Sequence, residues 1–435
     1  MPDRTRRPPV RVVHLGLGAF HRAHQAWYTD RADDGWGIAA FTGRSPAAAT
    51  ALAAQDCVYV LVERSAQGDT ASVVQSIVSA HDGADAPAWR AAVADPVVAV
   101  LTLTVTEAGY HATASGELDA ALLDDVAALR SDGSARTAPG RVVDGLRARR
   151  AAGVGPVAVV SCDNLPANGS LTERVVRGVA GAVDPDLDAW IARNVSFVST
   201  MVDRITPATT DDDRAVAREL TGFADAVPVV TEPFSEWVLS GEFPAGRPPW
   251  ERVGARFVDD IEPYERRKLW LLNAGHSLLA YRGRLLGHET VAQAAGPLAD
   301  ELELLWQEAR PLLTLASEEI DEALAALRER FANPRIRHSL AQIATDGSFK
   351  LPVRIVDPLR RRVAAGLPAG QAQLGVLADW AEYLVRFGPT DDASGGLADA
   401  IRGMLDPRAR AGAVLAAIDG PDILIDPLAT RLERL

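Results

Sequence analysis

One short segment, ERRKLWLLNAGHS (265–277), holds residues whose types and spacing suit proton and hydride chemistry. Lys268 supplies a base, Asn273 an amide dipole and His276 an imidazole that can bind a hydroxyl. At about 100° per residue, offsets of five and eight place Asn273 and His276 within about 140° of Lys268 on a helix. Glu265 falls inside the same arc. Removing a hydride from a secondary alcohol without a metal needs a base and dipoles of this kind.

The residues between these polar groups predict that the helix is buried. Leu269, Trp270, Leu271 and Leu272 make it apolar nearly all round. Burial lowers the pKa of a lysine side chain and makes it a usable base near neutral pH. The competing interpretation is an ordinary core helix with a salt bridge from Glu265, and this segment alone leaves both open.

Composition sets the broad class of the protein. The chain has 435 residues, enough for two or three domains, and a net charge of −13, which argues against a nucleic-acid partner. Its two cysteines, Cys57 and Cys162, form neither a disulfide framework nor a metal cluster, so we expect no metal and a reducing cytoplasm. The longest apolar run, 97–105, is too short to span a bilayer, so no membrane partner is expected. The expected state is a monomer or a small homo-oligomer.

Strand-like runs alternate with helical stretches in the first part of the chain, which predicts a mostly parallel α/β sheet. The runs are 11–15, 36–41, 57–64, 71–79, 97–105 and 154–164. After about residue 262 long helical stretches follow, and Pro263 fits the first turn of a helix. We therefore expect a Rossmann-like dinucleotide-binding domain over 1–262 and a mostly α-helical substrate and catalytic domain over 263–435. Segment 228–262 is expected to be extended structure that joins them.

Gly16 and Gly18 follow the first strand and open a helix, where a dinucleotide fold places its glycines. The third glycine of that pattern is replaced by His21, so the match is weak by itself. No acidic residue follows the second strand to hold the adenosine ribose. Arg44 stands there instead and either accepts a 2′-phosphate, stacks on adenine or is a solvated loop residue. These residues leave NAD and NADP both open.

His21, Arg22 and His24 form a small polar cluster after the glycines. Two imidazoles at this spacing suggest a metal site, but no carboxylate or thiol stands nearby in sequence to complete it. We expect these side chains to contact cofactor or substrate.

With these features set out, the chain resembles the polyol-specific long-chain dehydrogenases, a group with mannitol 2-dehydrogenases and fructuronate and tagaturonate reductases. The matching stretches keep the family order from about residue 14 to 354. They are GLGAFHRAHQA, TVTEAGY, SCDNLPANG, MVDRITP, TEPFSEW, KLWLLNAGHS and DGSFKLPVR. The resemblance implies metal-independent hydride transfer between NAD(P), most simply NAD, and a small sugar-derived alcohol.

The resemblance also assigns roles residue by residue. Lys268 is the general acid/base, and Asn164 and Asn273 are the amides that stabilise the developing alkoxide. His276 positions substrate hydroxyls, and Glu265 passes the proton between Lys268 and water. The residues expected to bind the cofactor are Gly16, Gly18, Ala19 and Phe20 of the glycine turn, Arg44 after the second strand, and Thr106. The substrate is assigned Asp203, Gln342, Lys350 and Arg354.

Two of the substrate residues bear on which substrate is used. Mannitol 2-dehydrogenases tend to have arginine at the position of Gln342, and the version here is more similar to fructuronate reductases. Arg354 suits a uronate carboxylate because a guanidinium binds carboxylates in two-point geometry, although an ordinary loop arginine is the alternative. For Asp203 a structural pair with Arg204 carries equal weight. We expect a fructuronate reductase-like enzyme (D-mannonate/D-fructuronate), with a mannitol 2-dehydrogenase or another polyol dehydrogenase as the alternative.

Three other classes compete with this interpretation. Tyr264 and Lys268 match the tyrosine–lysine pair of short-chain dehydrogenases, but those are single domains with the pair midway along the chain. A zinc alcohol dehydrogenase is disfavoured because cysteine is scarce. A non-catalytic dinucleotide sensor on the same fold would have no reason to keep a base beside two alkoxide-stabilising amides.

Overall fold

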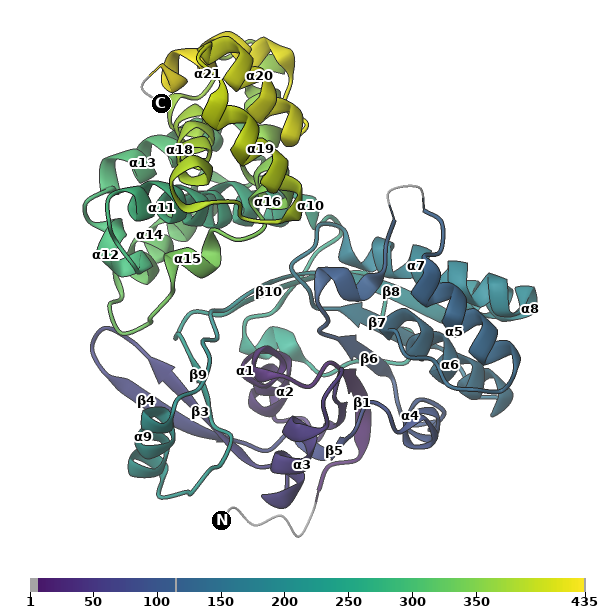
Figure 1. The fold of residues 1–435 in the computed structure, drawn as a ribbon. Helices are drawn as coiled ribbons and strands as arrows, with labels where there is room; N and C mark the ends of the chain where they lie inside the picture. The colour runs from purple at the N-terminus through teal and green to yellow at the C-terminus, as the bar shows by residue number, and fades with distance from the viewer. Residues whose placement is uncertain (1–6, 114–115, 434–435) are drawn as a thin grey trace. The chain divides into compact units, whose positions relative to one another are not determined.

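The computed structural model describes residues 7–113 and 116–433, which form two compact units. The first ends at Glu262 and the second begins at Pro263 (Figure 1).

An eight-stranded sheet forms the centre of the first unit, in the order β11-β10-β8-β7-β6-β1-β2-β5, and a three-stranded sheet, β4-β3-β9, accompanies it. All neighbours in the large sheet are parallel except β8 and β10. The strands are β1 (Val10–Leu15), β2 (Gly37–Phe41), β3 (Tyr59–Arg64), β4 (Asp69–Val74), β5 (Ile77–His81), β6 (Val100–Leu103), β7 (Val157–Ser161), β8 (Val195–Asp203), β9 (Val229–Thr231), β10 (Glu236–Ser240) and β11 (Arg256–Phe257).

Helices cover both faces of the large sheet because its strands are apolar on both sides. Val12 of β1 points into one core with α1, α2 and α3, whereas Val13 points into the other with α4 to α8. The helices of this unit are α1 (Ala19–Ala23), α2 (Gln25–Ala32), α3 (Ala47–Ala54), α4 (Ala86–Val93), η1 (Glu107–Tyr110), α5 (Ala120–Arg130), α6 (Ala138–Ala151), α7 (Asn168–Val183), α8 (Pro185–Asn194), α9 (Asp211–Thr221) and η2 (Trp250–Val253).

The parallel strands place the candidate residues of this unit at one edge. β1, β2, β6, β7 and β8 run in the same direction, so their carboxyl ends lie together. The glycine turn follows β1, Arg44 follows β2, Thr106 follows β6 and Asn164 follows β7, while Asp203 ends β8. In open α/β sheets this is the edge at which ligands bind.

Three expectations about the sheet need correction. Run 71–79 is two strands, β4 and β5, because Gln75 N donates to Asp30 Oδ1 (2.6 Å) and Ser76 Oγ donates to Ala26 O (2.7 Å), so α2 draws the chain out of line. Segment 228–262 is extended as expected, but it does more than join the two units, since β9, β10 and β11 are strands of the two sheets. Strand β8, with its many serines and threonines, was not predicted.

The second unit is built from helices, and its described residues form no β-strand beyond an isolated bridge between Thr290 and Ser339. Trp270, Leu278 and Trp380 belong to its single large core, where α11 packs against α18. The helices are α10 (Glu262–Arg267), η3 (Lys268–Asn273), α11 (Ala274–Leu285), α12 (Val291–Ala295), α13 (Ala299–Ala309), η4 (Arg310–Leu312), α14 (Ser317–Ala332), α15 (Leu340–Ile343), α16 (Gly347–Leu351), η5 (Pro352–Val356), α17 (Asp357–Ala364), α18 (Gln371–Phe387), α19 (Asp392–Gly403), α20 (Pro407–Ala417), η6 (Asp422–Leu424) and α21 (Ile425–Leu432). The α/β class with a mostly helical C-terminal part is confirmed.

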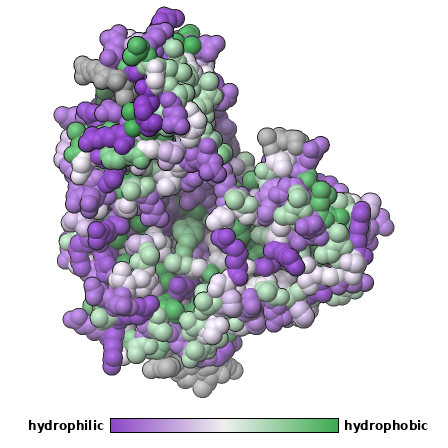
Figure 2. Space-filling model, viewed as in Figure 1, coloured by the Kyte–Doolittle hydropathy of each residue, from purple (hydrophilic) through white to green (hydrophobic). Residues whose placement is uncertain are grey.

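On the face shown in Figure 2, hydrophilic residues cover most of the surface and hydrophobic ones form small patches between them. Within the described ranges, no helix has both the length and the apolar character needed to cross a membrane.

Candidate active site

Gly16 is required by the way β1 packs against β6. Its φ is +110°, and a Cβ built on it would lie 1.9 Å from Thr104 O. The amides of Gly16 and Leu17 both donate to Phe41 O at 2.9 Å, which fixes the turn to the end of β2. Any side chain at this position would push the turn off the neighbouring backbone.

Gly18 differs, because the protein itself leaves room for a side chain there. Its φ is −142°, and the nearest atom to a built Cβ is Gly16 O at 3.6 Å. Helix α1 then begins at Ala19 without a side-chain cap. The first amides of a helix have no acceptor within the helix. The turn therefore offers amide donors and an open approach, which fits the pyrophosphate of a dinucleotide.

The other predicted cofactor residues lie near this turn at the sheet edge. Arg44 is exposed in the loop after β2, where Arg141 Nη1 donates to Gly43 O (2.8 Å) and holds the loop. Thr106 is exposed and precedes η1. Phe20 is partly buried and stacks on His24, with ring centroids 5.1 Å apart.

The cluster after the glycines proves to be structural, which corrects the expectation of ligand contacts. His21 is fully buried and stacks on His14 at 3.3 Å between ring centroids. Arg22 donates to Val227 O, and His24 Nε2 lies 3.0 Å from Glu236 O. Arg22 and His24 thus bond to the backbone of this unit, whereas the ring nitrogens of His21 have no hydrogen-bond partner among the described residues.

Asn164 and Asp203 complete the candidate residues of this unit. The side chain of Asn164 is exposed just beyond the end of β7, and Asp203 is buried at the end of β8. Arg204 forms its salt bridge with Glu63, Nη2 to Oε1 2.5 Å, and donates to Ala23 O at 2.6 Å. The carboxylate partner shown for Arg204 is therefore on β3.

In the second unit Lys268 and Asn273 are the first and last residues of a π-helix, η3. Hydrogen bonds in a π-helix connect residues five apart, so Asn273 lies closer above Lys268 than an α-helix would place it. Trp270, Leu271 and Leu272 are buried, whereas Lys268 and Asn273 are partly buried. Glu265 is partly buried on the preceding helix, α10. The polar face is thus narrower than predicted, and its lysine less enclosed.

His276 follows on α11 and is buried against Phe331 and His338, at 4.9 Å and 4.8 Å between ring centroids. Burial holds its pKa well below the ordinary value, and nearby basic groups add to the effect. These groups are His338, Arg330, Arg354 and Lys268. The imidazole is therefore neutral, with one donor and one acceptor nitrogen for substrate hydroxyls.

Two buried polar atoms of this face have no protein partner. Among the residues that the structure describes, none hydrogen-bonds to Asn273 Oδ1 or His276 Nε2. Buried polar atoms rarely stay unsatisfied unless a ligand or water completes them. Both atoms thus fit a role in binding a polyhydroxylated molecule.

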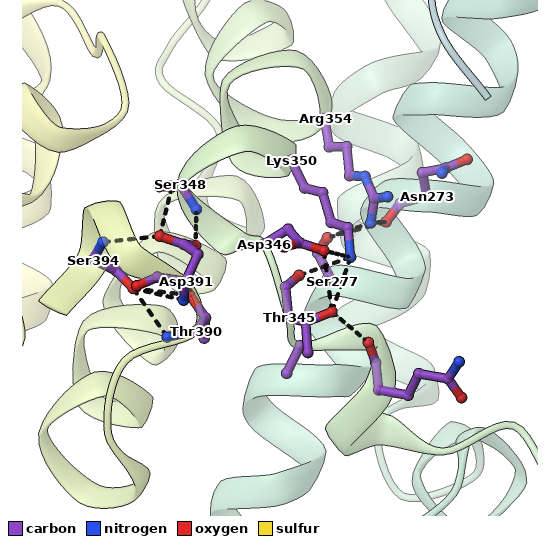
Figure 3. Close-up of polar contacts among 12 residues, drawn as sticks. Asn273, Ser277, Thr345, Asp346, Ser348, Lys350, Arg354, Thr390, Asp391 and Ser394 are labelled. Atoms are coloured by element: carbon purple, nitrogen blue, oxygen red, sulfur yellow. Dashed lines mark hydrogen bonds and ion pairs between the residues drawn. The ribbon is translucent and has the colours of Figure 1, made fainter. Parts of the chain in front are cut away.

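Arg354 lies beside the same face, on the second π-helix, η5 (Figure 3). Its Nη1 donates to Ser277 Oγ at 3.3 Å and lies 3.5 Å from Asn273 O. The structure thus brings Lys268, Asn273, His276 and Arg354 together within one unit.

Lys350 is set in a local turn, donating from Nζ to Thr345 O at 2.7 Å and lying 3.4 Å from Asp346 Oδ2 (Figure 3). Gln342 is exposed on α15. The neighbouring Ser348 bonds through N (3.0 Å) and Oγ (2.8 Å) to Asp391. The DGS part of the motif therefore has a structural role, fixing the start of α16.

Four residues close to His276 or Asn164 were not predicted from the sequence. Arg330 and His338 contribute to the environment of His276. Tyr110 and Asp163 form a buried network at the ends of β6 and β7. For Asp163, its position directly before Asn164 was the available signal; no spacing rule connects Arg330 or His338 to His276.

Both units of the chain match models of one protein family. The family model of the Mannitol dehydrogenase Rossmann domain matches residues 10–252, and that of the Mannitol dehydrogenase C-terminal domain matches residues 260–413. The D-mannonate oxidoreductase of Escherichia coli (strain K12) is 40% identical over 387 residues, covering 86% of this chain and 79% of that protein. The Mannitol 2-dehydrogenase of Cereibacter sphaeroides is 40% identical over 397 residues, covering 87% and 81%.

Among solved structures, the Pseudomonas fluorescens mannitol 2-dehydrogenase, a ternary complex with NAD and D-mannitol, superimposes with a TM-score of 0.83. It is 33% identical, and the match covers 98% of this chain and 91% of that one. The two family models together span most of the chain. The chain belongs to the mannitol dehydrogenase family, whose members are oxidoreductases that act on CH–OH groups.

Proposed function

We propose that this enzyme interconverts a sugar acid and its keto form with NAD, as a D-mannonate/D-fructuronate oxidoreductase. The observation that supports it is the positive charge around His276, to which Arg330, Arg354 and Lys268 contribute. Fixed cations on a partly buried face favour an anionic ligand, because charge is screened less there than in water. A carboxylate on the substrate would meet this charge, whereas a neutral polyol would not.

The proposed roles follow from the chemistry of each side chain. Bound NAD supplies the hydride acceptor. Lys268, when neutral, accepts the proton of the reacting hydroxyl, and Glu265 passes that proton on to water. The amides of Asn164 and Asn273 donate to the oxygen as negative charge develops on it. His276, neutral because it is buried, binds a neighbouring hydroxyl. In the reductive direction the protonated Lys268 donates.

The experiment that tests this function follows NADH and NADPH oxidation with fructuronate, tagaturonate and fructose. We expect the highest kcat/KM with NADH and a hexuronate. Faster turnover of fructose would favour the mannitol 2-dehydrogenase alternative, which the Cereibacter sphaeroides relative represents. No turnover with either cofactor would favour a dinucleotide-binding protein without catalytic activity.

Arg354→Ala should raise KM for the sugar acid about ten- to hundredfold, because a hydrogen bond to a charged group contributes about 1.5–3 kcal/mol. The turnover of fructose should change by less than about threefold. Steady-state kinetics with both substrates measures the difference. Arg282→Ala is the matched control. Arg282 lies on α11 in the same unit, but its guanidinium pairs with Asp379 at 3.6 Å. Equal effects of Arg354→Ala on both substrates would contradict the carboxylate role.

A further inference from the structure

A single buried carboxylate, that of Asp163, connects the carboxyl ends of β6 and β7. Leu103 pairs with Ser161, so the two strands end side by side. Asp163 Oδ1 accepts a hydrogen bond from Val105 N at 2.8 Å, and Oδ2 accepts one from Tyr110 Oη at 2.5 Å. The loop after β6 is thereby held to the loop after β7.

Both loops carry candidate site residues. Thr106 follows Val105 directly, and Asn164 follows Asp163 directly. The backbone beside Asn164 is held a second time, because Asn168 Nδ2 donates to Asp163 O at 2.9 Å. The exposed Asn164 side chain therefore projects from a fixed backbone.

We propose that Asp163 is a positioning residue, which sets the positions of Thr106 and Asn164 through Val105 and Tyr110 and accepts hydrogen bonds from both of these groups only when it is ionised. The inference rests on the proposed function, in which Asn164 donates to the reacting oxygen. Asp163 itself need not touch substrate or cofactor, because it acts through the two loops.

The surroundings of Asp163 make its ionisation relevant at neutral pH. Burial raises its pKa to about 7, although the bonds from Tyr110 and Val105 favour the charged form. Tyr110, which faces it from η1, and Cys162, which precedes it, also have their pKa raised by burial and stay neutral. Thr172 of α7 adds a hydroxyl near Tyr110.

The two protonation states differ in how they bond. The carboxylate accepts from both Val105 and Tyr110, and bonds to an ionised acceptor are roughly twice as strong as neutral ones. The protonated form still accepts from Val105 but donates to Tyr110, whose hydroxyl then turns to Ser161 Oγ, its other partner. Asp163→Asn copies this second state, with an amide oxygen for Val105 and an amide N–H for Tyr110.

The test is the ratio of kcat for the parent to kcat for Asp163→Asn, measured at each pH. We expect the ratio to approach one below the pKa of about 7 and to rise to about tenfold above it. The ionisation of Lys268 is common to both proteins and divides out of the ratio. A ratio that stays constant with pH would overturn the proposal.

Two further variants separate positioning from simple loss of structure. Tyr110→Phe removes a donor that favours the carboxylate of Asp163. In this variant the midpoint of the Asp163 ionisation should therefore lie at a higher pH than in the parent. Asp125→Asn is the matched control, because Asp125 is also buried and accepts from Arg136 N (2.7 Å) and Thr137 Oγ1 (2.6 Å), but on α5. Its ratio to the parent should show no step near neutral pH.

Stability provides a reading that needs no substrate. The pKa of Asp163 is higher in the folded protein than the ordinary 3.8, so folding takes up a proton and stability falls as pH rises from there to about 7. Asp163→Asn lacks this ionisation and should gain stability relative to the parent over the same window. If the difference in unfolding temperature between Asp163→Asn and the parent stayed the same across this pH window, ionisation at this site would be contradicted.

Hydrogen exchange distinguishes failure of this inference from failure of the proposed function. In Asp163→Asn, peptides covering 104–110 should exchange more slowly than in the parent at pH 8 and equally at pH 6, without any substrate, because the buried charge of the parent favours opening of this loop. Equal exchange at both pH values would overturn the positioning role. Asn164→Ala, assayed in parallel, should lower kcat at every pH, and normal turnover there would sink the role of Asn164 instead.

Discussion

Lys268→Ala should lower kcat about 10³- to 10⁴-fold while the affinity for NAD changes by less than about threefold. General acid–base catalysis contributes up to about 10⁴-fold, and Lys268 belongs to η3 of the second unit, whereas the glycine turn belongs to the first unit. Steady-state kinetics gives kcat, and quenching of tryptophan fluorescence gives the affinity for NADH. A loss of cofactor binding equal to the loss of turnover would contradict the assignment of Lys268 as the base.

Lys268→Arg is the more discriminating variant. Lys268 and Lys350 are the only two lysines among the 45 lysine and arginine residues of the chain; all the others are arginines. A guanidinium keeps the positive charge but cannot give up its proton near neutral pH. Lys268→Arg should therefore be as inactive as the alanine variant, and added small amines should restore activity only to Lys268→Ala. An active arginine variant would mean that the charge of Lys268 matters and its proton does not.

Tyr264→Phe is the control for the short-chain alternative. If tyrosine were the acid, this change would abolish turnover and Lys268→Ala would matter less. We expect kcat of Tyr264→Phe to stay within about threefold of the parent, since the contact shown for Tyr264 is that of its ring with the Arg267 guanidinium (5.5 Å), which phenylalanine keeps.

The sequence predicted the strands that lead into the site because they are apolar and end in glycine or polar residues. β1, β2, β6 and β7 are of this kind, and their common direction follows from the helices between them. β8 was missed because serine and threonine interrupt its apolar pattern. The division of 71–79 depends on bonds from α2, and contacts so distant in the chain leave no local pattern.

The polar face that carries Lys268, Asn273 and His276 was predicted as a group of residues but not in its geometry. Periodicity placed Lys268, Asn273 and His276 on one side of a helix, yet it assumed α-helical geometry. The π-helix changes the angle between these side chains around the helix axis. No residue pattern in 268–273 predicts a π-helix. Arg330 and His338 reach His276 from α14 and from the segment before α15, through packing that only the folded unit creates.

The cluster at His21, Arg22 and His24 shows the opposite error. Polar residues beside a glycine turn suggested ligand contacts, but Arg22 and His24 bond to backbone oxygens of the same unit and His21 stacks on His14. Sequence position alone cannot distinguish a polar group that faces a ligand from one that fixes a helix to its sheet. For Arg22 and His24 the bonds to Val227 O and Glu236 O decide it.

Gly18→Ala should weaken NAD binding at least about a hundredfold without destabilising the protein. The backbone at Gly18, with φ −142°, accepts any residue, and a built Cβ meets nothing closer than 3.6 Å. The methyl group would instead occupy the space through which a pyrophosphate approaches the amides at the start of α1. We expect an unfolding temperature within about 2 °C of the parent and measure binding by calorimetry with NADH.

Gly16→Ala is the matched comparison, because it changes the same turn by the same methyl group but should act on stability. With φ at +110° and Thr104 O only 1.9 Å from the built Cβ, β1 and β6 would have to separate. Such strain costs about 4 kcal/mol or more, which corresponds to a fall of roughly 8 °C or more in unfolding temperature. If Gly18→Ala bound NADH like the parent while Gly16→Ala behaved as expected, the turn would be a structural feature, and the cofactor would have to bind elsewhere on the sheet edge.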